Sequence, residues 1–235
     1  MSTRSGGGLD AVTVRQRLDV VRQRISAAGG EASAVTVVGV TKTFPLEVVN
    51  VAIAAGLGDL GESYAQELAT KASELRLLDE GRLRWHFIGG LQRNKVKRVA
   101  HVVSLWQSVD RLELGAEIAR RAPGAAVLVQ VNTTGEATKA GCRPGLAPGL
   151  VEGLVDLGLE VRGLMTVGPT DATIDPRPGF AALRSLVDQL GLEVCSMGMS
   201  GDLDAAVAEG STMVRVGTAL FGARPGTETP DSSVS

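Results

Sequence analysis

A lysine follows the first strongly apolar run of the chain. The run covers residues 35–40 (Val-Thr-Val-Val-Gly-Val), and Lys42 comes two residues after its end. Few neighbours can hydrate an ammonium group at the end of a buried strand, so burial there favours the neutral amine. A neutral amine is a nucleophile that condenses with an aldehyde to give a Schiff base. The alternative is a rim lysine that packs its apolar stem and extends its charge into water.

Two glycine-rich turns near the C-terminus have the composition of an anion site. The first covers residues 195–202 and leads into a short predicted helix over 203–209, with Asp202 as its expected N-cap. The second covers residues 215–222 and again places a glycine and a hydroxyl after an apolar strand. Glycines let the backbone approach a ligand, and hydroxyls with helix N-terminal N–H groups favour an anion. Two such turns in succession predict a phosphate site, and the alternative is ordinary turn chemistry.

An imidazole lies inside an apolar stretch near the middle of the chain, where His86 stands within residues 85–88. A histidine in such a strand either contacts a ligand or is a core residue hydrogen-bonded to a neighbour. Neither the two histidines, His86 and His101, nor the two cysteines have the spacing of a metal site, so we expect no metal. Cys142 and Cys195 are expected to be reduced thiols with structural or pocket-lining positions.

The composition is that of a chain with one substantial hydrophobic core. With 235 residues, 44% of them hydrophobic, and two cysteines, disorder and a disulfide scaffold are excluded. The 24 basic and 26 acidic residues are interspersed and leave a net charge of −2, which argues against a nucleic-acid partner. Apolar runs of about five to eight residues are far short of the ~20 that span a bilayer. The N-terminus lacks the apolar segment of a secretory signal, so we expect a cytoplasmic protein without a membrane partner.

Short runs rich in Val, Leu and Ile alternate along the chain with stretches of helical period, which is typical of a repeated βα unit. The predicted strands cover residues 35–40, 59–61, 85–88, 102–109, 126–131, 161–167, 193–197 and 213–216. The predicted helices cover residues 11–27, 46–55, 64–78, 111–121, 146–157, 178–190 and 203–209.

These elements predict an α/β fold: a single (β/α)8 TIM barrel with an extra N-terminal helix, at about 29 residues per unit. The alternative is an open doubly wound sheet, but its G-x-G-x-x-G motif is missing after the first strand. We assign residues 10–224 to the barrel, 1–9 to a disordered leader and 225–235 to a disordered tail. In such a barrel Lys42 and both turns lie at the C-terminal ends of strands, where functional groups gather.

Five motifs taken together resemble the pyridoxal phosphate homeostasis protein family. They are Lys42 after the first strand, Gly-Glu-Ser-Tyr-Ala-Gln-Glu at 61–67, Trp-His-Phe-Ile-Gly-Gly-Leu-Gln-Arg-Asn-Lys at 85–95, Ser-Met-Gly-Met-Ser-Gly-Asp at 196–202, and Arg-Val-Gly-Thr-Ala-Leu-Phe-Gly at 215–222. The order of the motifs over roughly residues 10–224 makes the resemblance specific, whereas no single motif does.

The resemblance implies a barrel like the N-terminal domain of bacterial alanine racemase, with pyridoxal 5′-phosphate (PLP) held as a Schiff base on Lys42. The residues it implies at or near the phosphate are Ser196, Met197, Ser200, Gly217 and Thr218. It also implies that Arg215 faces the pyridine nitrogen. Because a guanidinium keeps its proton, that nitrogen stays unprotonated and the ring is a poor electron sink.

The cofactor site that the resemblance implies also includes Ser63, His86, Asn132 and Met165. Ser63 replaces the asparagine that is usual in the family, so a shorter hydroxyl stands where an amide could contact the cofactor. Asn132 is expected over the cofactor ring, and Met165 either lines the pocket or packs in the core. Lys139, in the loop after the fifth strand, is a second candidate amine.

Three functions fit these residues. A PLP-binding protein of intracellular vitamin B6 homeostasis, with no or very weak turnover, fits best because Arg215 disfavours carbanion chemistry. A PLP-dependent amino acid racemase of this fold needs a tyrosine from a separate β-domain; this chain shows no such domain and has only Tyr64. A class I Schiff-base aldolase fits less well, because this chain lacks the acidic groups expected beside the amine of Lys42. The expected partners are PLP and apo PLP-dependent enzymes, and we expect a monomer.

Overall fold

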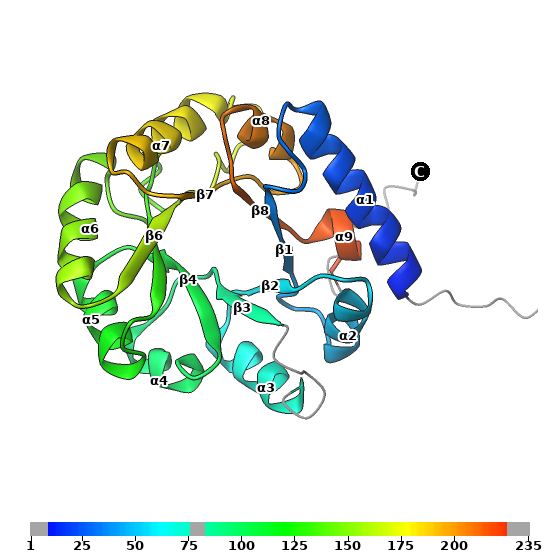
Figure 1. The fold of residues 1–235 in the computed structure, drawn as a ribbon, viewed down its shortest axis with the longest axis horizontal. Coiled ribbons are helices and arrows are strands. Elements are labelled where there is room, and N and C mark those ends of the chain that lie inside the picture. The colour runs from blue at the N-terminus through cyan, green and yellow to red at the C-terminus, as the bar shows by residue number, and fades with distance from the viewer. Residues whose placement is uncertain (1–8, 76–82, 225–235) are drawn as a thin grey trace, which may run out of the picture.

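The computed structural model describes residues 9–75 and 83–224, which form a closed barrel of parallel strands surrounded by helices (Figure 1). The predicted leader and tail lie outside the described residues except for Leu9. That residue is partly buried and packs against the hydrophobic core.

Each strand of the barrel pairs in parallel with the next in the chain. Within the described residues the strands are β1 (Thr36–Val40), β2 (Asp59–Glu62), β3 (Arg84–Phe87), β4 (Val103–Val109), β5 (Ala126–Gln130), β6 (Glu160–Met165), β7 (Val194–Ser196) and β8 (Met213–Val216). The barrel closes where β1 pairs with β8, with Thr36 opposite Met213 and Gly39 opposite Val216. All eight predicted strands are confirmed, and the open-sheet alternative is wrong.

Helices cover the outside of the barrel. In the same part of the chain they are α1 (Ala11–Ala27), α2 (Leu46–Ala54), α3 (Ala65–Leu75), α4 (Val96–Val99), α5 (Leu112–Arg121), α6 (Ala147–Asp156), α7 (Arg177–Gln189), α8 (Leu203–Ala208) and α9 (Thr218–Phe221), with 3-10 turns η1 (Arg93–Lys95) and η2 (Pro144–Leu146). The seven predicted helices are confirmed to within a few residues, although 76–78 of one of them lie outside the described residues. The sequence did not predict α4 and α9, because four residues are too few to show a period.

Helix α1 is the predicted extra helix, and its bounds match the prediction. Its apolar residues recur on one face, and Val14, Leu18, Val21 and Ile25 are all buried. Asp10 caps the helix by accepting a hydrogen bond from the Thr13 N–H at 2.7 Å. The buried face packs against α2, α8 and α9, so α1 covers the seam where β1 meets β8 (Figure 1).

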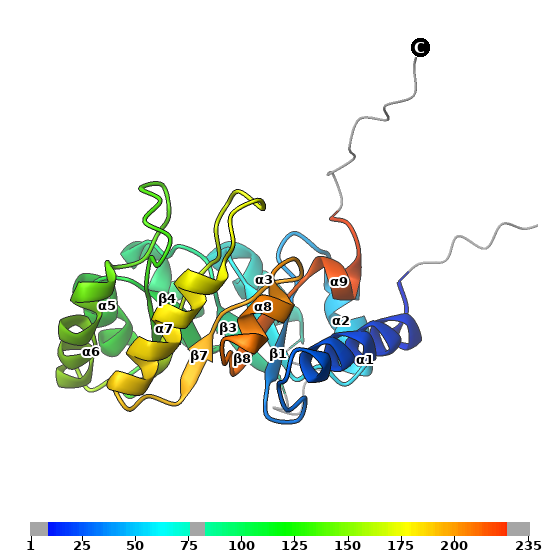
Figure 2. The ribbon, with the colours of Figure 1, turned by 90° about the horizontal axis from the view of Figure 1, so that it is seen from above.

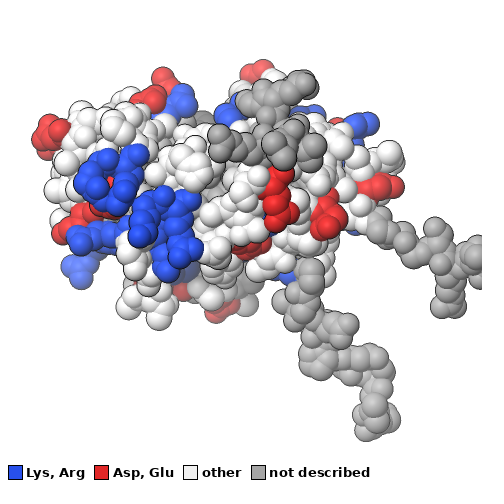
Figure 3. Space-filling view, turned by 90° about the horizontal axis from the view of Figure 1, so that it is seen from below, with Lys and Arg blue, Asp and Glu red and all other residues white. Residues whose placement is uncertain are grey.

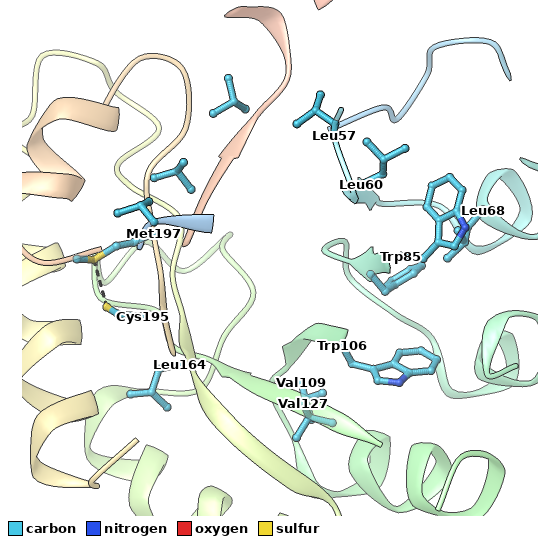
Figure 4. Close-up of a cluster of buried hydrophobic side chains, with 14 of the residues drawn as sticks. Leu57, Leu60, Leu68, Trp85, Trp106, Val109, Val127, Leu164, Cys195 and Met197 are labelled. Atoms are coloured by element: carbon cyan, nitrogen blue, oxygen red, sulfur yellow. Dashed lines mark hydrogen bonds between the residues drawn. The ribbon is translucent and has the colours of Figure 1, made fainter. Parts of the chain in front are cut away.

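The core has two layers because the strands alternate inward and outward side chains. Outward residues such as Leu60, Trp85 and Trp106 pack toward the helices, where Leu68 of α3 lies near Trp85 (Figure 4). Inside the barrel, a smaller apolar cluster contains Val38, Leu105, Leu128, Met165 and Met213. The barrel interior also holds buried polar side chains, and one of them, Gln107, contacts Met213 of that cluster.

All strand C-termini meet at one end of the barrel because the strands are parallel. The loops after β5 and β6 stand above this rim (Figure 2), and the Lys139 Nζ atom of one loop donates to the Gly168 carbonyl of the other. In the part of the chain that the structure describes, no helix is both long and apolar enough to cross a membrane. On one face of the molecule, Lys and Arg gather on the surface over α4 and α5 (Figure 3).

Candidate functional site

Lys42 lies at the rim two residues after the end of β1, with its side chain half-buried. Burial lowers the pKa of its ammonium group, the positive charge of Arg224 lowers it further, and the Glu62 carboxylate opposes both. Across residues 9–75 and 83–224, no carboxylate lies within ion-pair distance of the Lys42 Nζ atom. The amine at this position is therefore easier to deprotonate than an ordinary lysine.

A cluster of one lysine and two glutamates, mostly buried, holds the backbone on both sides of Lys42. We call Lys71, Glu62 and Glu67 the lysine clamp. The Lys71 Nζ atom donates to the Thr41 carbonyl and to Glu62 Oε1, both at 2.7 Å, and to Glu67 Oε1 at 2.6 Å. Glu62 Oε1 also accepts from the Thr41 hydroxyl at 2.8 Å, and Glu67 Oε1 accepts from the Thr43 N–H at 2.7 Å.

The lysine clamp holds a strained turn, since Thr43 has a φ of 67°. Glu62 is fully buried, and its Oε2 atom has no hydrogen-bond partner among the described residues. Burial raises the pKa of the Glu62 carboxyl, although Lys71 and Thr41 act in the opposite direction. The sequence motif contained Glu62 and Glu67, but only the fold shows that both meet Lys71.

The two predicted phosphate turns lie side by side at the rim. The Ala219 N–H at the start of α9 donates to Ser200 Oγ at 3.3 Å, which joins the turn after β7 to the turn after β8. A Cβ atom on Gly217 would lie 3.3 Å from the Val40 carbonyl, so this glycine lets the second turn pass close to β1. Gly217, Thr218 and Ser200 thus stand beside the strand that leads to Lys42.

The first of these turns needs a glycine at residue 198. Gly198 has a φ of 96°, and a Cβ atom there would lie 2.6 Å from the Cβ of Ala206. Asp202 occupies the predicted N-cap position of α8, but its side chain does not cap the helix. Instead its Oδ1 atom accepts from the Met199 N–H at 2.5 Å and closes the turn.

Arg215 is buried inside the barrel and contacts neutral acceptors. Its Nη1 atom donates to Ser196 Oγ and its Nη2 atom to the Thr166 carbonyl, both at 2.7 Å. In the described chain no carboxylate lies within ion-pair distance of this guanidinium. Burial lowers the pKa of Arg215 to about 10, so it keeps its proton at neutral pH. A cation held by two neutral acceptors fits a further acceptor such as a ring nitrogen.

His86 and Ser196 take part in a buried chain of side chains. The His86 Nε2 atom lies 2.9 Å from Asp59 Oδ1, and its Nδ1 atom lies 2.8 Å from Gln107 Nε2. Ser196 donates to Gln107 Oε1 at 2.7 Å and accepts from Arg215. Both ring nitrogens of His86 are therefore engaged by protein groups, and the residue reaches Arg215 only through its neighbours. Direct contact of His86 and Ser196 with a cofactor stays a prediction.

The remaining predicted residues occupy different surroundings. Asn132 uses both ends of its amide within its own loop, where Nδ2 donates to the Glu136 carbonyl at 2.9 Å and Oδ1 accepts from Gly135 N–H at 3.1 Å. Met165 belongs to the apolar cluster inside the barrel, and Met197 is fully buried in the outer layer. Ser63 follows β2 at the rim and is half-buried. Contact of these four residues with a cofactor stays a prediction.

The second candidate amine and the thiols are engaged or shielded. Lys139 forms an ion pair with Glu136 at 2.7 Å. Burial raises the pKa of the Cys142 thiol to about 11 and that of Cys195 to about 12, so neither is a reactive thiolate at neutral pH. Among the described residues, no group of three or more His, Cys, Asp or Glu side chains could hold a metal ion.

Comparison with known proteins places this architecture in a family. The family model for the N-terminal domain of alanine racemase matches residues 11–225. A protein of Pseudomonas aeruginosa named pyridoxal phosphate homeostasis protein is 44% identical over 212 residues, which cover 87% of this chain and 91% of the relative. The chain belongs to the pyridoxal phosphate homeostasis protein family. The Escherichia coli K12 member is 34% identical over 228 residues, covering 90% of this chain and 97% of the relative.

Solved structures similar to this chain share the barrel. PipY of Synechococcus elongatus, solved with PLP bound, superimposes with a TM-score of 0.75 at 31% identity, covering 89% of this chain and all (100%) of PipY. A Bifidobacterium adolescentis protein superimposes with a TM-score of 0.83 at 36% identity, covering 94% and 100% of the two chains. The alanine racemase of Clostridium difficile, at 18% identity and a TM-score of 0.66, shares the fold alone, over 90% of this chain and 58% of the racemase.

Proposed function

We propose that this protein binds PLP as a Schiff base on Lys42 and acts in intracellular vitamin B6 homeostasis, with no or very weak catalytic turnover. The observation that carries the proposal is the position of Gly217 against the Val40 carbonyl. It brings a turn suited to phosphate next to the strand whose end carries an amine with a lowered pKa. The name of the family and the PLP-bound PipY relative support the same cofactor.

Each part of the site has a distinct role in this proposal. Ser200, Gly217 and Thr218 bind the phosphate through hydroxyl and backbone N–H groups. Arg215 donates to the ring nitrogen, and its two neutral acceptors leave its positive charge unneutralised for that contact. When bound, PLP supplies an aldehyde carbon that reacts with amines. The lysine clamp holds Lys42 at the rim, where partial burial favours the neutral amine.

Weak turnover is the interpretation best supported for this site. An arginine at the ring nitrogen, in place of a carboxylate, leaves that nitrogen unprotonated and makes the ring a weaker electron sink for a carbanion at the substrate α-carbon. Tyr64 is the only tyrosine in the chain, and its side chain is largely exposed at the rim. The aldolase alternative has less support, because within the described residues no carboxylate pairs with Lys42.

The first test is the visible absorption spectrum of the purified protein with added PLP, followed by borohydride reduction and peptide mass mapping. We expect a yellow protein with a phosphopyridoxyl group on Lys42. The Lys42→Ala variant should lose covalent attachment and keep its fold, because the side chain is only half-buried, and Lys139→Ala is the matched control. A colourless protein that stays unmodified after reduction contradicts the proposal. A phosphopyridoxyl group found on Lys139 instead would show that the Schiff base forms on that lysine and not on Lys42.

The phosphate contact can be tested separately. Thr218→Val replaces a hydroxyl by a methyl group of similar size and should weaken PLP binding by about 1.5–3 kcal/mol, the range for a hydrogen bond to a charged group. Binding of unphosphorylated pyridoxal should not change in this variant. Equal affinity of the native protein for pyridoxal and PLP rules out a phosphate site at these turns.

The wider role of the protein stays a prediction. We propose that it acts in the cytoplasm as a monomer and passes PLP to apo-enzymes. Mixing the PLP-loaded protein with an apo PLP-dependent enzyme should restore the activity of that enzyme faster than an equal concentration of free PLP does. Equal rates mean that transfer runs through solution, and size-exclusion chromatography with light scattering gives the oligomeric state.

A further inference from the structure

A continuous chain of hydrogen bonds crosses the interior of the barrel. It runs from Arg215 on β8 to Ser196 on β7, Gln107 on β4, His86 on β3 and Asp59 on β2, with no contact longer than 2.9 Å. We call these five residues the interior chain. Ser196 and Gln107 are fully buried, and Arg215, His86 and Asp59 are nearly so. Asp59 is the first residue of β2, so the chain extends from the region of the rim toward the opposite end of the barrel.

Arginine at one end sets the direction of every hydrogen bond in the interior chain. A guanidinium can only donate, so Ser196 Oγ accepts from Arg215 and must direct its single proton elsewhere. That proton goes to Gln107, which fixes the amide oxygen toward Ser196 and the amide nitrogen toward His86. The second N–H of the amide donates to the Met213 Sδ atom at 3.2 Å.

The same logic fixes the tautomer of His86. Its Nδ1 atom faces an NH2 group and therefore accepts, so the ring proton is on Nε2 and is donated to Asp59. Asp59 is a carboxylate that can only accept, and it also binds Arg84 in a two-point contact, Nε to Oδ1 at 2.7 Å and Nη2 to Oδ2 at 2.5 Å. The chain thus starts at an obligatory donor and ends at an obligatory acceptor, with no conflicting group between them.

We infer that Gln107 and His86 are positioning residues, which orient Arg215 toward the ring nitrogen of PLP through Ser196. The inference rests on the proposed function. Arg215 has no carboxylate beside it among the described residues, so its orientation depends on the Thr166 carbonyl and on the lone pair that Ser196 presents. Gln107 holds the Ser196 proton away from the guanidinium, and His86 with Asp59 holds the Gln107 amide in the orientation that does so.

The test uses two ligands that differ only at the ring nitrogen: PLP and its analogue with carbon in that position. The measured quantity is the ratio of the Kd for the analogue to the Kd for PLP. In the native protein we expect a ratio well above one, because only PLP accepts from Arg215. Gln107→Met removes the amide at similar volume and should lower the ratio about tenfold, the effect of about one hydrogen bond.

Gln130→Met is the matched control. Gln130 is also a buried glutamine of the barrel, but its Nε2 atom donates to the Ala140 carbonyl at 3.1 Å, outside the interior chain. The Gln130→Met variant should leave the ratio of the two Kd values unchanged. An unchanged ratio in Gln107→Met, or an equal fall in Gln130→Met, overturns the inference. Failure of the native protein to bind PLP refutes the proposed function instead, and the inference falls with it.

A second measurement needs neither cofactor nor a variant in the interior chain. The whole protein has only two histidines, so the His101→Gln variant assigns the imidazole signals in a 15N NMR spectrum. We expect the His86 Nε2 atom to carry the proton and Nδ1 to have the shift of an acceptor. The opposite tautomer in the native protein overturns the argument, since Nδ1–H cannot face the amide NH2 of Gln107.

Discussion

The two ends of the proposed PLP site are held in place by different interactions. At the Lys42 end, the lysine clamp places one ammonium and two carboxylates around the turn, and Lys71 and Glu62 are buried. At the phosphate end, the turns after β7 and β8 meet through Ser200 Oγ and a backbone N–H, without a charged group between them. Charge near this end comes from Asp202, whose carboxylate accepts from the Met199 N–H within the first turn, and from Arg24 of α1, which donates to the Ser200 carbonyl at 3.1 Å.

This difference matches what each end has to bind. A nucleophilic amine needs a fixed backbone and partial burial, and a buried ion cluster supplies a rigid frame without neutralising the amine itself. A phosphate carries its own negative charge, so uncharged hydroxyls and N–H groups can bind it without an existing ion pair that must first be broken. Variants at each end can therefore show whether that end contributes mainly to the stability of the fold or to the affinity for PLP.

The largest effect is expected from Lys71→Met at the Lys42 end. It removes three hydrogen bonds and leaves Glu62 buried without its cation, so we expect a loss of about 3–5 kcal/mol in the free energy of unfolding. Urea unfolding measures the loss, with exposed Lys97→Met as the control. The double variant with Glu62→Gln should recover part of it. A loss below about 1 kcal/mol, the range of surface ion pairs, shows that the clamp does not hold the turn.

A smaller effect is expected from Gly198→Ala at the phosphate end. The positive φ and the contact with Ala206 both oppose a Cβ atom, and together they should cost about 1–3 kcal/mol of stability. PLP affinity should fall as well, because the turn that carries Ser200 must shift. Gly145→Ala is the control, since a Cβ there has no atom within 4 Å. Unchanged stability and affinity would mean that the turn adapts freely.

The acid dependence of stability should differ between Glu62 and Asp59. Burial raises the pKa of Glu62 in the folded state above its ordinary value of 4.5. Between 4.5 and the raised pKa, the folded state therefore holds more protons than the unfolded state, and the free energy of unfolding falls as pH rises. Burial also acts to raise the pKa of Asp59, but the hydrogen bonds from His86 and Arg84 outweigh it and the pKa lies below 3.8. There the unfolded state holds more protons, so stability is lost as pH falls through the lowered value.

Glu62→Gln and Asp59→Asn should therefore change the pH profile in opposite directions. The first variant should remove the fall in stability above pH 4.5, and the second should remove the acid loss below pH 3.8. Urea unfolding from acid to neutral pH measures both profiles. Parallel changes in the two variants would contradict the assignment of opposite pKa shifts.

The smallest effect is expected from Asp204→Asn. Asp204 accepts from Arg24 Nε at 3.0 Å and Nη2 at 2.9 Å, but its side chain is largely exposed. We expect at most about 1 kcal/mol of lost stability, and less at high salt, as for other surface ion pairs. Thermal unfolding at two salt concentrations is the measurement, with Asp19→Asn as the control. A loss as large as that of Lys71→Met would remove the contrast between the two ends.

The barrel was predictable because its signals are local. Each strand is a short apolar run, and each longer helix shows its period within its own residues, as Val14 to Ile25 do in α1. Helix α4 was missed because its four residues include two charges and show no period. The position of Lys42 at the rim also followed from local order, since it comes directly after an apolar strand in a barrel whose strand ends meet.

The supporting residues were not predictable in the same way. Glu62 was visible as part of a motif, but nothing in the sequence says that Lys71 reaches it and the Thr41 carbonyl. Gln107 belongs to a mostly apolar strand and Asp59 to a short one, and the sequence predicted no functional role for either residue. His86 was placed in the cofactor site from its motif, and the fold shows both of its nitrogens bound to neighbouring strands.

The sequence by itself determined the strands, the longer helices, the rim lysine and the two glycine turns, because periodicity and turn chemistry act between residues close in the chain. The tertiary structure alone decided which polar side chains meet. Ser196 and Gln107 are 89 residues apart in sequence, and Arg215 and Thr166 are 49 apart. Such contacts depend on barrel closure and strand register, which place buried donors opposite buried acceptors and which no local pattern encodes.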